Sequence, residues 1–254
     1  MKKIAIIFAG GSGQRVGADI PKQFLKICGR EIIVHTLELF ELNDNIDEIY
    51  VVCIEDWIEY LQNLISKYDI TKVCKILPGG VTGQDSIFIG LKAVKEDNEN
   101  AIVLIHDGVR PLVSQETINN CINCVESYNS AVPVIKCFET PIISNDGEGV
   151  QDMPIRRKMF LAQAPQGYYL NDIYNAHLRE RDCNPNYNDI VDSCGLMFKQ
   201  GFKSHLIEGD RGNIKVTTPD DFYLLLNNLN MRDYEQISLL NEKINERRTK
   251  IDNN

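Results

Sequence analysis

A glycine-rich segment near the start of the chain carries residue types that suit binding of a polyphosphate. Its letters are AGGSGQRVG at residues 9–17, and the letters PKQ follow at residues 21–23. Glycines let backbone N–H groups approach an anion closely, because no Cβ atom stands in the way. Arg15 and Lys22 bring two cations to the same segment, which follows a five-residue apolar run. The combination predicts a buried strand that leads into a phosphate-binding loop.

Two familiar phosphate-binding loops do not match this segment. A Walker loop needs Gly-Lys followed by Ser or Thr, and the chain contains no Gly-Lys pair. A dinucleotide-binding fingerprint needs a helix directly after its glycines and an acidic residue roughly 20 positions later. Pro21 interrupts an early helix, and the next expected strand reaches its acidic residue only at Glu55. A structural strand and turn without a ligand remains the alternative from these residues alone.

Two further segments place glycine or charged residues directly after apolar runs. The letters PGG begin at residue 78 and HDGVR at residue 106. Ligands of parallel sheets bind beyond the carboxyl ends of the strands, so we expect all three segments to line one crevice. Asp107 and Arg110 form either a simple ion pair or a functional pair. In the second case Asp107 meets a divalent metal or a ribose hydroxyl, and Arg110 orients Asp107 or a phosphate.

Short apolar runs alternate with amphipathic segments along most of the chain. This alternation predicts an α/β fold with a mostly parallel central sheet and helices on both faces. Strands are expected at residues 4–8, 49–54, 73–77, 101–105, 131–135 and 205–209. Helices are expected at residues 31–40, 57–67, 85–94, 169–181, 189–200 and 219–230.

Residues 137–155 interrupt the alternation. The letters SNDGEG within them predict a turn between short extended runs, and therefore a protruding β-arm. We expect one domain over residues 1–230, with this arm inside it, and a peripheral C-terminal helix and tail over residues 231–254.

The composition is that of an ordinary globular protein, with 43% hydrophobic and 25% charged residues. A net charge of −9 argues against nucleic acid as a partner. The sequence has neither a long apolar run nor a signal-peptide pattern, so no membrane association and a cytoplasmic location are expected. Eight cysteines lack a framework spacing, and Cys121 and Cys124 fall inside an expected helix, which favours buried thiols over zinc ligands.

Five motifs, in order over residues 3–226, resemble the cytidylyltransferases that act on methylerythritol phosphate and ribitol phosphate. They are the glycine loop with PKQF, the GG…S turn, HDGVRP, an arginine followed by QAPQ, and EG…NIKVTTPDD. The resemblance implies a single Rossmann-like nucleotidyltransferase domain. It also implies transfer of a cytidylyl group from CTP to a polyol phosphate, with Mg²⁺ as cofactor and release of pyrophosphate. Such chemistry depends on positioning and charge neutralisation and needs no covalent nucleophile.

The resemblance assigns a role to each matching residue. Arg15, Lys22 and Lys215 would be catalytic, and Asp107 would also meet the metal. CTP would be bound by Ala9, Gly10, Gly11, Gly13, Gly79, Gly80, Ser86 and Asp107. The acceptor would be bound by Arg110, Arg156, Ala164 and Thr217. In the family the arm crosses to a second subunit, which implies a homodimer with exchanged arms; the alternative is an arm folded back on its own domain.

Several departures from the family pattern concern the acceptor. Ala164 stands where threonine is usual, Gly83 where arginine is common, and Cys137 near a position often held by threonine. HDGVRP, MPIRRKMF and the Asp192-Ser193-Cys194 triplet resemble the ribitol enzymes more than the methylerythritol enzymes. D-ribitol 5-phosphate is therefore the expected acceptor, and 2-C-methyl-D-erythritol 4-phosphate the alternative. A nucleotide-binding regulatory module without turnover and a nicotinamide-dependent oxidoreductase are alternatives of other classes.

Overall fold

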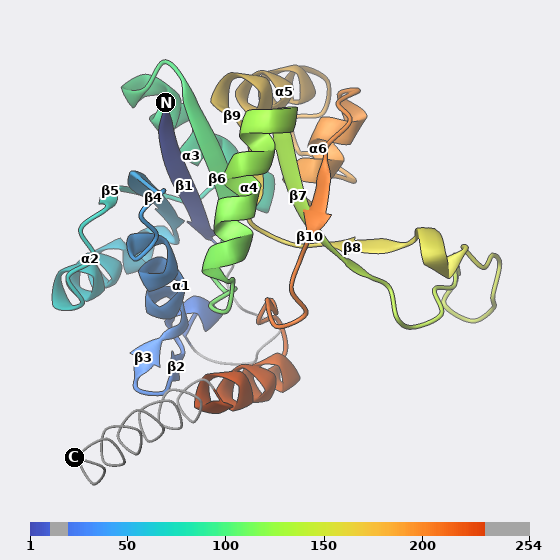
Figure 1. The fold of residues 1–254 in the computed structure, drawn as a ribbon, viewed down its shortest axis with the longest axis horizontal. Helices are drawn as coiled ribbons and strands as arrows, with labels where there is room; N and C mark the ends of the chain where they lie inside the picture. Colours follow the sequence, from blue (N-terminus) through green and yellow to red (C-terminus); the bar gives the residue numbers. More distant parts are fainter. Residues whose placement is uncertain (11–19, 232–254) are drawn as a thin grey trace, which may run out of the picture.

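The computed structural model describes residues 1–10 and 20–231 of the 254 residues. Its central sheet has the strand order β10-β7-β9-β6-β1-β4-β5, and β8 pairs with β7 (Figure 1). The strands of this sheet are β1 (Lys2–Ala9), β4 (Glu48–Cys53), β5 (Val73–Pro78), β6 (Ala101–Asp107), β7 (Ser130–Lys136), β8 (Phe160–Ala162), β9 (Gln166–Tyr169) and β10 (Leu206–Glu208). A small hairpin, β2 (Lys26–Ile27) with β3 (Arg30–Glu31), lies outside it.

The sheet is mixed and mostly parallel, as the sequence predicts. β1 pairs in parallel with β4 and β6, β4 with β5, and β10 with β7. β9 was not expected as a strand; it runs antiparallel between β6 and β7. Its sequence, Gln-Gly-Tyr-Tyr, lacks the aliphatic run that marks the parallel strands. A Cβ on Gly167 would lie only 2.7 Å from a Val125 methyl, so this strand packs too closely for a side chain there.

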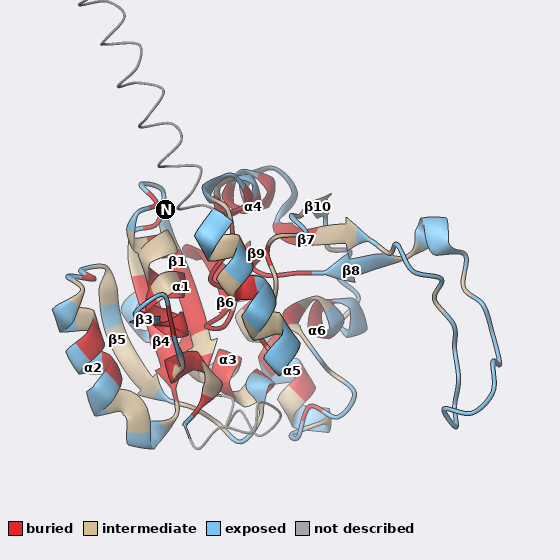
Figure 2. Cartoon of the chain, turned by 90° about the horizontal axis from the view of Figure 1, so that it is seen from below, coloured by how far each residue is buried: buried red, intermediate tan, exposed pale blue. Residues whose placement is uncertain are grey.

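Helices cover both faces of the sheet, and the sheet separates the core into two layers (Figure 2). Odd-numbered apolar residues of β1, such as Ala5 and Ile7, face α1, α2 and α4, whereas Ile4 and Ile6 face α3, α5 and α6. This alternation explains why the whole run is apolar, because both of its faces are buried. The helices are α1 (Ile32–Glu41), α2 (Ile58–Lys67), α3 (Gly83–Asp97), α4 (Gln115–Tyr128), α5 (Leu170–Cys183) and α6 (Ser193–Lys199).

The sixth helix is shorter than the expected span of residues 189–200. Asp189 has a φ of 63°, which no α-helix contains, and the helix begins only after Asp192. The Asp192 carboxylate caps it by accepting a hydrogen bond from the Gly195 N–H at 2.8 Å. A last helical segment, residues 219–231, extends one residue past the expected domain boundary and packs Leu225 on a third cluster that includes Ile27 and Val216.

Residues 137–155 protrude from the domain between β7 and β8, as expected (Figures 1 and 2). They do not form the regular hairpin that the turn signal suggests. Ile143 and Asp152 form one isolated bridge, and the antiparallel pairing is made instead at the base of the protrusion by β7 and β8. Cys121 and Cys124 lie buried in α4, where their thiols donate to the Pro165 and Ser130 carbonyls. No helix of the described residues is long and apolar enough to cross a membrane.

Candidate active site

A crevice opens at the carboxyl end of β1, where the chain changes its direction of travel across the sheet. From β1 the chain proceeds to β4 and β5 on one side, and then returns to add β6 on the other side. Such a switch point is the usual ligand site of open α/β sheets. Two adjoining cavities of about 470 and 170 Å³ lie here, and they share Phe8, Gly83, Asp107 and Lys215. We call them the larger and the smaller half of the crevice.

The larger half gathers most of the residues expected to bind the nucleotide. From the expected set, it is lined by Ala9, Gly10, Lys22, Gly80, Ser86, Asp107 and Lys215. Gly79 is next to Gly80 but does not line the cavity; its N–H donates to the Cys53 carbonyl at 2.7 Å. Gly11, Gly13 and Arg15 lie outside the described residues.

One wall of the larger half is the turn that precedes α3. Thr82 caps the helix by accepting a hydrogen bond from the Asp85 N–H, and the Asp85 side chain accepts one from the Thr82 N–H in return. The Gly80 N–H donates to Ser86 Oγ at 3.1 Å. A Cβ on Gly80 would lie 2.3 Å from the Asp85 Cβ, so only glycine fits here. The wall is therefore held by the first turn of α3.

Lys22 reaches the crevice from a short 3₁₀ helix, Lys22–Phe24, that begins after Pro21. The next two side chains fix its place. Gln23 is buried, and its amide donates to the Ala9 carbonyl at 2.6 Å, which ties the segment to the end of β1. Phe24 is also buried and stacks on Trp57 with ring centroids 4.6 Å apart. The PKQF letters thus anchor a lysine beside the glycine segment.

Asp107 forms the charged centre of the crevice. Its Oδ2 accepts from Arg110 Nε at 2.8 Å, and its Oδ1 lies 2.5 Å from Lys215 Nζ. Burial alone would raise the pKa of Asp107, but the two cations outweigh burial and hold that pKa below its ordinary value. Asp107 is therefore ionised at neutral pH. The simple ion pair with Arg110 is present, and Lys215 is a second partner that the sequence did not predict.

Lys215 is held in place by a network of backbone contacts around it. Arg110 Nη1 donates to the Asn213 carbonyl at 2.8 Å, and Asn213 Nδ2 donates to the Ala164 carbonyl at 2.6 Å. The Val216 N–H donates to the Val109 carbonyl at 2.9 Å. The segment NIKV is therefore attached on both sides of the lysine.

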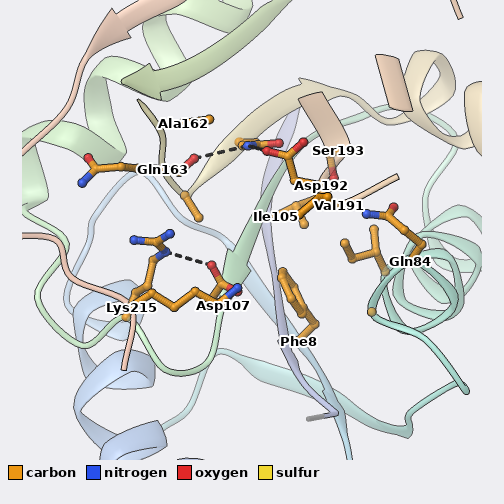
Figure 3. Close-up of a pocket in the computed structure, with 15 residues that line it drawn as sticks. Phe8, Gln84, Ile105, Asp107, Ala162, Gln163, Val191, Asp192, Ser193 and Lys215 are labelled. Carbon is orange, nitrogen blue, oxygen red and sulfur yellow. Dashed lines mark hydrogen bonds and ion pairs between the residues drawn. The ribbon is translucent and has the colours of Figure 1, made fainter. Parts of the chain in front are cut away.

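The smaller half extends from Asp107 and Lys215 toward the start of α6 (Figure 3). Arg110 and Ala164 of the expected acceptor set line it. At its far end lie Gln84 Oε1 and Ser193 Oγ, two buried atoms for which the described part of the chain supplies no hydrogen-bond partner. Buried polar atoms are usually satisfied, so these two oxygens give this end of the cavity a polar wall that is not fully satisfied within the described part of the chain.

Two residues of the expected acceptor set lie away from the crevice of their own chain. Arg156 follows the end of the arm, where its Nη1 donates to the Phe138 carbonyl at 3.1 Å. The Thr217 hydroxyl donates to Asp221 Oδ2 at 2.7 Å, beside the cap of the last helical segment. Neither side chain lines either half of the crevice.

One family model matches most of the chain. A family model described as IspD, 2-C-methyl-D-erythritol 4-phosphate cytidylyltransferase, matches residues 3–230. The chain belongs to the IspD family.

Relatives within this family carry two names. A ribitol-5-phosphate cytidylyltransferase of Vibrio parahaemolyticus is 46% identical over 224 residues, covering 87% of this chain and 93% of that protein. A 2-C-methyl-D-erythritol 4-phosphate cytidylyltransferase of Clostridium botulinum is 40% identical over 223 residues, covering 88% and 95%. Among solved structures, the 4-diphosphocytidyl-2C-methyl-D-erythritol synthase of Anaerococcus prevotii is 27% identical with a TM-score of 0.77, covering 90% and 96%.

Sequence reasoning missed several polar residues of this IspD-family crevice. Gln166 donates to Asp192 Oδ2 at 2.9 Å and accepts from the Cys194 N–H at 2.8 Å, which holds the loop before α6 over the smaller half. Gln84 and Gln23 are likewise buried. Glutamine is ordinarily a surface residue, so its type gave no signal. Position within the QAPQ and PKQF motifs was the available clue for two of them.

Two buried histidines predict that the fold loses stability below about pH 6.5. Burial lowers the pKa of His106 to about 4 and that of His177 to about 3. Both stay neutral in the folded state, whereas the unfolded chain takes up their protons as the pH falls through 6.5. From pH 7.5 to 5, each should therefore cost about 2 kcal/mol of unfolding free energy.

Urea unfolding, followed by Trp57 fluorescence at both pH values, measures this loss. His177→Gln removes one of the two protonation sites and should reduce the difference by about half. His205→Gln, at an exposed position, is the control and should leave the difference unchanged. An unchanged difference in the His177 variant would contradict the assignment.

Proposed function

We propose that this protein transfers a cytidylyl group from CTP to D-ribitol 5-phosphate, releasing pyrophosphate and forming a CDP-polyol. The observation that carries the proposal is the charged centre of the crevice, where Lys215, Asp107 and Arg110 meet between two adjoining cavities. A reaction between two phosphorylated molecules needs two adjoining pockets with cations between and around them, and Lys215 lines both pockets here. The family membership supplies the reaction class.

In the proposed reaction an oxygen of the acceptor's phosphate attacks the α-phosphorus of CTP. A new P–O bond forms to that oxygen, and the bond between the α-phosphorus and the bridging oxygen of pyrophosphate breaks. Lys22, which lines the larger half, would neutralise the departing pyrophosphate, and Lys215 the α-phosphate. Asp107 holds the ammonium group of Lys215 between the two pockets. Catalysis then rests on charge and position.

Mg²⁺ fits this crevice as a metal carried mainly by the nucleotide. Among the described residues, Asp107 is the carboxylate that lines the larger half, and Mg²⁺ is commonly held by one or two carboxylates together with substrate phosphates. The described residues contain no group of three or more His, Cys, Asp or Glu side chains that could hold a metal by themselves. When bound, Mg²⁺ would neutralise phosphate charge. Because both oxygens of Asp107 already meet cations, the metal would share this carboxylate with Lys215 or Arg110.

The choice of ribitol phosphate over methylerythritol phosphate is supported by the relatives, and the pocket expected to take the acceptor has polar side chains in its wall. Relatives named ribitol-5-phosphate cytidylyltransferase reach 46%, 42% and 43% identity, and those named for methylerythritol phosphate 40% and 39%. Gln84 and Ser193 place polar side chains at one end of the smaller half. Ala164 lines it without a hydroxyl of its own.

A pyrophosphate-release assay with CTP, Mg²⁺ and a panel of polyol phosphates tests the proposal. We expect turnover with D-ribitol 5-phosphate and a kcat/KM for 2-C-methyl-D-erythritol 4-phosphate at least about tenfold lower, the factor that 1.4 kcal/mol of lost contact gives. A preference for the methylerythritol compound would favour the alternative acceptor. Tight CTP binding without pyrophosphate release on any member of the panel would favour a regulatory module.

A homodimer with exchanged arms is the second part of the proposal. The arm carries exposed apolar side chains, which need a covering surface. They include Phe138, Ile142, Ile143, Val150, Met153 and Ile155. Arg156, expected to hold the acceptor's phosphate, lies outside the crevice of its own chain. Exchange of arms around a two-fold axis would bring each Arg156 to the partner subunit's crevice and cover the apolar side chains.

A further inference from the structure

An ion pair links α5 to the wall of the larger half of the crevice. Arg181, near the end of α5, donates through Nη1 to Asp85 Oδ1 at 2.7 Å. Asp85 lies in the first turn of α3, 96 positions earlier in the chain. The helices α3 and α5 pack against each other, which brings the two residues together (Figure 2). Arg181 itself does not line the larger half.

The two oxygens of the Asp85 carboxylate have different partners. Oδ1 accepts from Arg181, while Oδ2 accepts from the Thr82 N–H at 3.1 Å and from the Thr82 hydroxyl at 2.8 Å. The space that a Cβ of Gly80 would need is filled by the Asp85 Cβ. A rotation of this carboxylate would break its contacts with Thr82, which lines the larger half together with Gly80.

The guanidinium group of Arg181 rests on an aromatic platform that fixes its direction. It lies 4.8 Å from the ring centroid of Phe88 and 5.7 Å from that of Tyr187. The Phe88 ring stacks on His177, and the Tyr187 hydroxyl hydrogen-bonds to His177 Nδ1 at 2.8 Å. Tyr187 and His177 are buried. Arg181 is thus presented to Asp85 from a rigid surface.

We infer that Arg181 is a positioning residue for the nucleotide. It acts through Asp85 to hold the turn at Gly80–Thr82 in the form that receives CTP. The inference rests on the proposed function for the identity of the nucleotide. An ordinary surface ion pair contributes little to stability and nothing to a ligand. This pair differs because its carboxylate is the one that caps the wall of the crevice.

The test measures the Kd of CTP by calorimetry in the full-length protein, together with kcat and the KM for CTP. Arg181→Leu should raise the Kd and KM for CTP about tenfold, which corresponds to about 1.4 kcal/mol of binding free energy lost when the turn is no longer held in place. The value of kcat at saturating CTP should stay within about twofold of wild type, because Arg181 touches no reacting atom. Arg181→Lys keeps the charge and should recover part of the affinity.

A double-mutant cycle separates positioning from general destabilisation. If Arg181 acts through Asp85, the variant carrying both Arg181→Leu and Asp85→Asn should bind CTP no more weakly than Asp85→Asn alone. Lys75→Leu is the matched control, because it breaks a similarly exposed ion pair, Lys75–Asp97, away from the crevice. It should leave the Kd of CTP unchanged.

The outcomes decide separately on the inference and on the proposed function. An unchanged Kd of CTP in Arg181→Leu, or additive losses in the double variant, would overturn the positioning role. If the control raises the Kd as much as Arg181→Leu does, the effect is general destabilisation and the inference is again wrong. Absence of turnover in a wild-type protein that binds CTP would instead overturn the transferase proposal and leave the binding cycle valid.

Discussion

Lys22→Ala should lower kcat for cytidylyl transfer by a factor of about 100 or more, the effect of removing one stabiliser of transition-state charge. Lys22 lines the larger half of the crevice beside Gly10, at the carboxyl end of β1. Negative charge on the pyrophosphate grows as its bond to the α-phosphorus breaks, so the lysine contributes most in the transition state. The KM for CTP should change much less than kcat does.

Steady-state kinetics with saturating acceptor measure this effect. Lys26→Ala is the matched control, four residues further along, where the lysine side chain is largely exposed and lies 3.5 Å from Glu31. It should retain wild-type kinetics. A Lys22→Ala enzyme that changes only the KM for CTP would show that the lysine binds substrate and transition state equally, and the proposed role would be wrong.

The parallel part of the fold could be predicted because its signal is local. β1, β4 and β6 are buried on both faces, so their sequences are short apolar runs that stand out from the helices around them. The rule that ligands lie beyond the carboxyl ends of such strands then placed Gly10, Gly80 and Asp107 in one crevice. Each of these inferences needs only the neighbouring residues.

The antiparallel part could not be predicted in the same way. β9 fits between β6 and β7 because of its long-range partners, and its own letters, QGYY, resemble a loop. The start of α6 was placed too early because Asp189 and Asp192 are both good helix caps by type, and only the fold shows that Asp192 is used. The arm has a strong turn signal, but its flanking residues find their partners mostly elsewhere, since β7 pairs with β8.

The residues of the candidate site also fall into those with a local sequence signal and those placed only by the fold. The residues proposed to contact phosphates were predicted by type, because glycine and cations in a loop have few other uses together. Other residues of the candidate site belong to it because they are buried in the wall of the crevice, which the sequence does not show. They are Gln84, Gln166 and Ser193. Among the described residues, Asp85 connects Arg181 to the wall of the crevice. A residue that acts through another leaves no motif, so only the arrangement of α3 and α5 reveals it.

Mixing two inactive variants should restore activity if the active site is shared between subunits. Arg156→Ala is expected to be nearly inactive, because the acceptor's phosphate loses its arginine, whereas Arg157→Ala next to it should keep its activity. A dimer of one Lys22→Ala chain and one Arg156→Ala chain has one crevice with an intact Lys22 that receives an intact Arg156 from the partner. Random exchange of equal amounts should therefore return about a quarter of wild-type activity, since half of the dimers are mixed and each has one intact site.

The reverse experiment distinguishes a shared site from one built within a single chain. A chain that carries both Lys22→Ala and Arg156→Ala is mixed with an equal amount of wild type. With exchanged arms, the wild-type crevice of a mixed dimer receives the defective arm, so only wild-type dimers work and activity falls to about a quarter of that of the same total amount of wild type. If each chain built its own site, about half would remain. Native mass spectrometry confirms that mixed dimers have formed, and activity near one half in their presence would contradict the exchanged-arm arrangement.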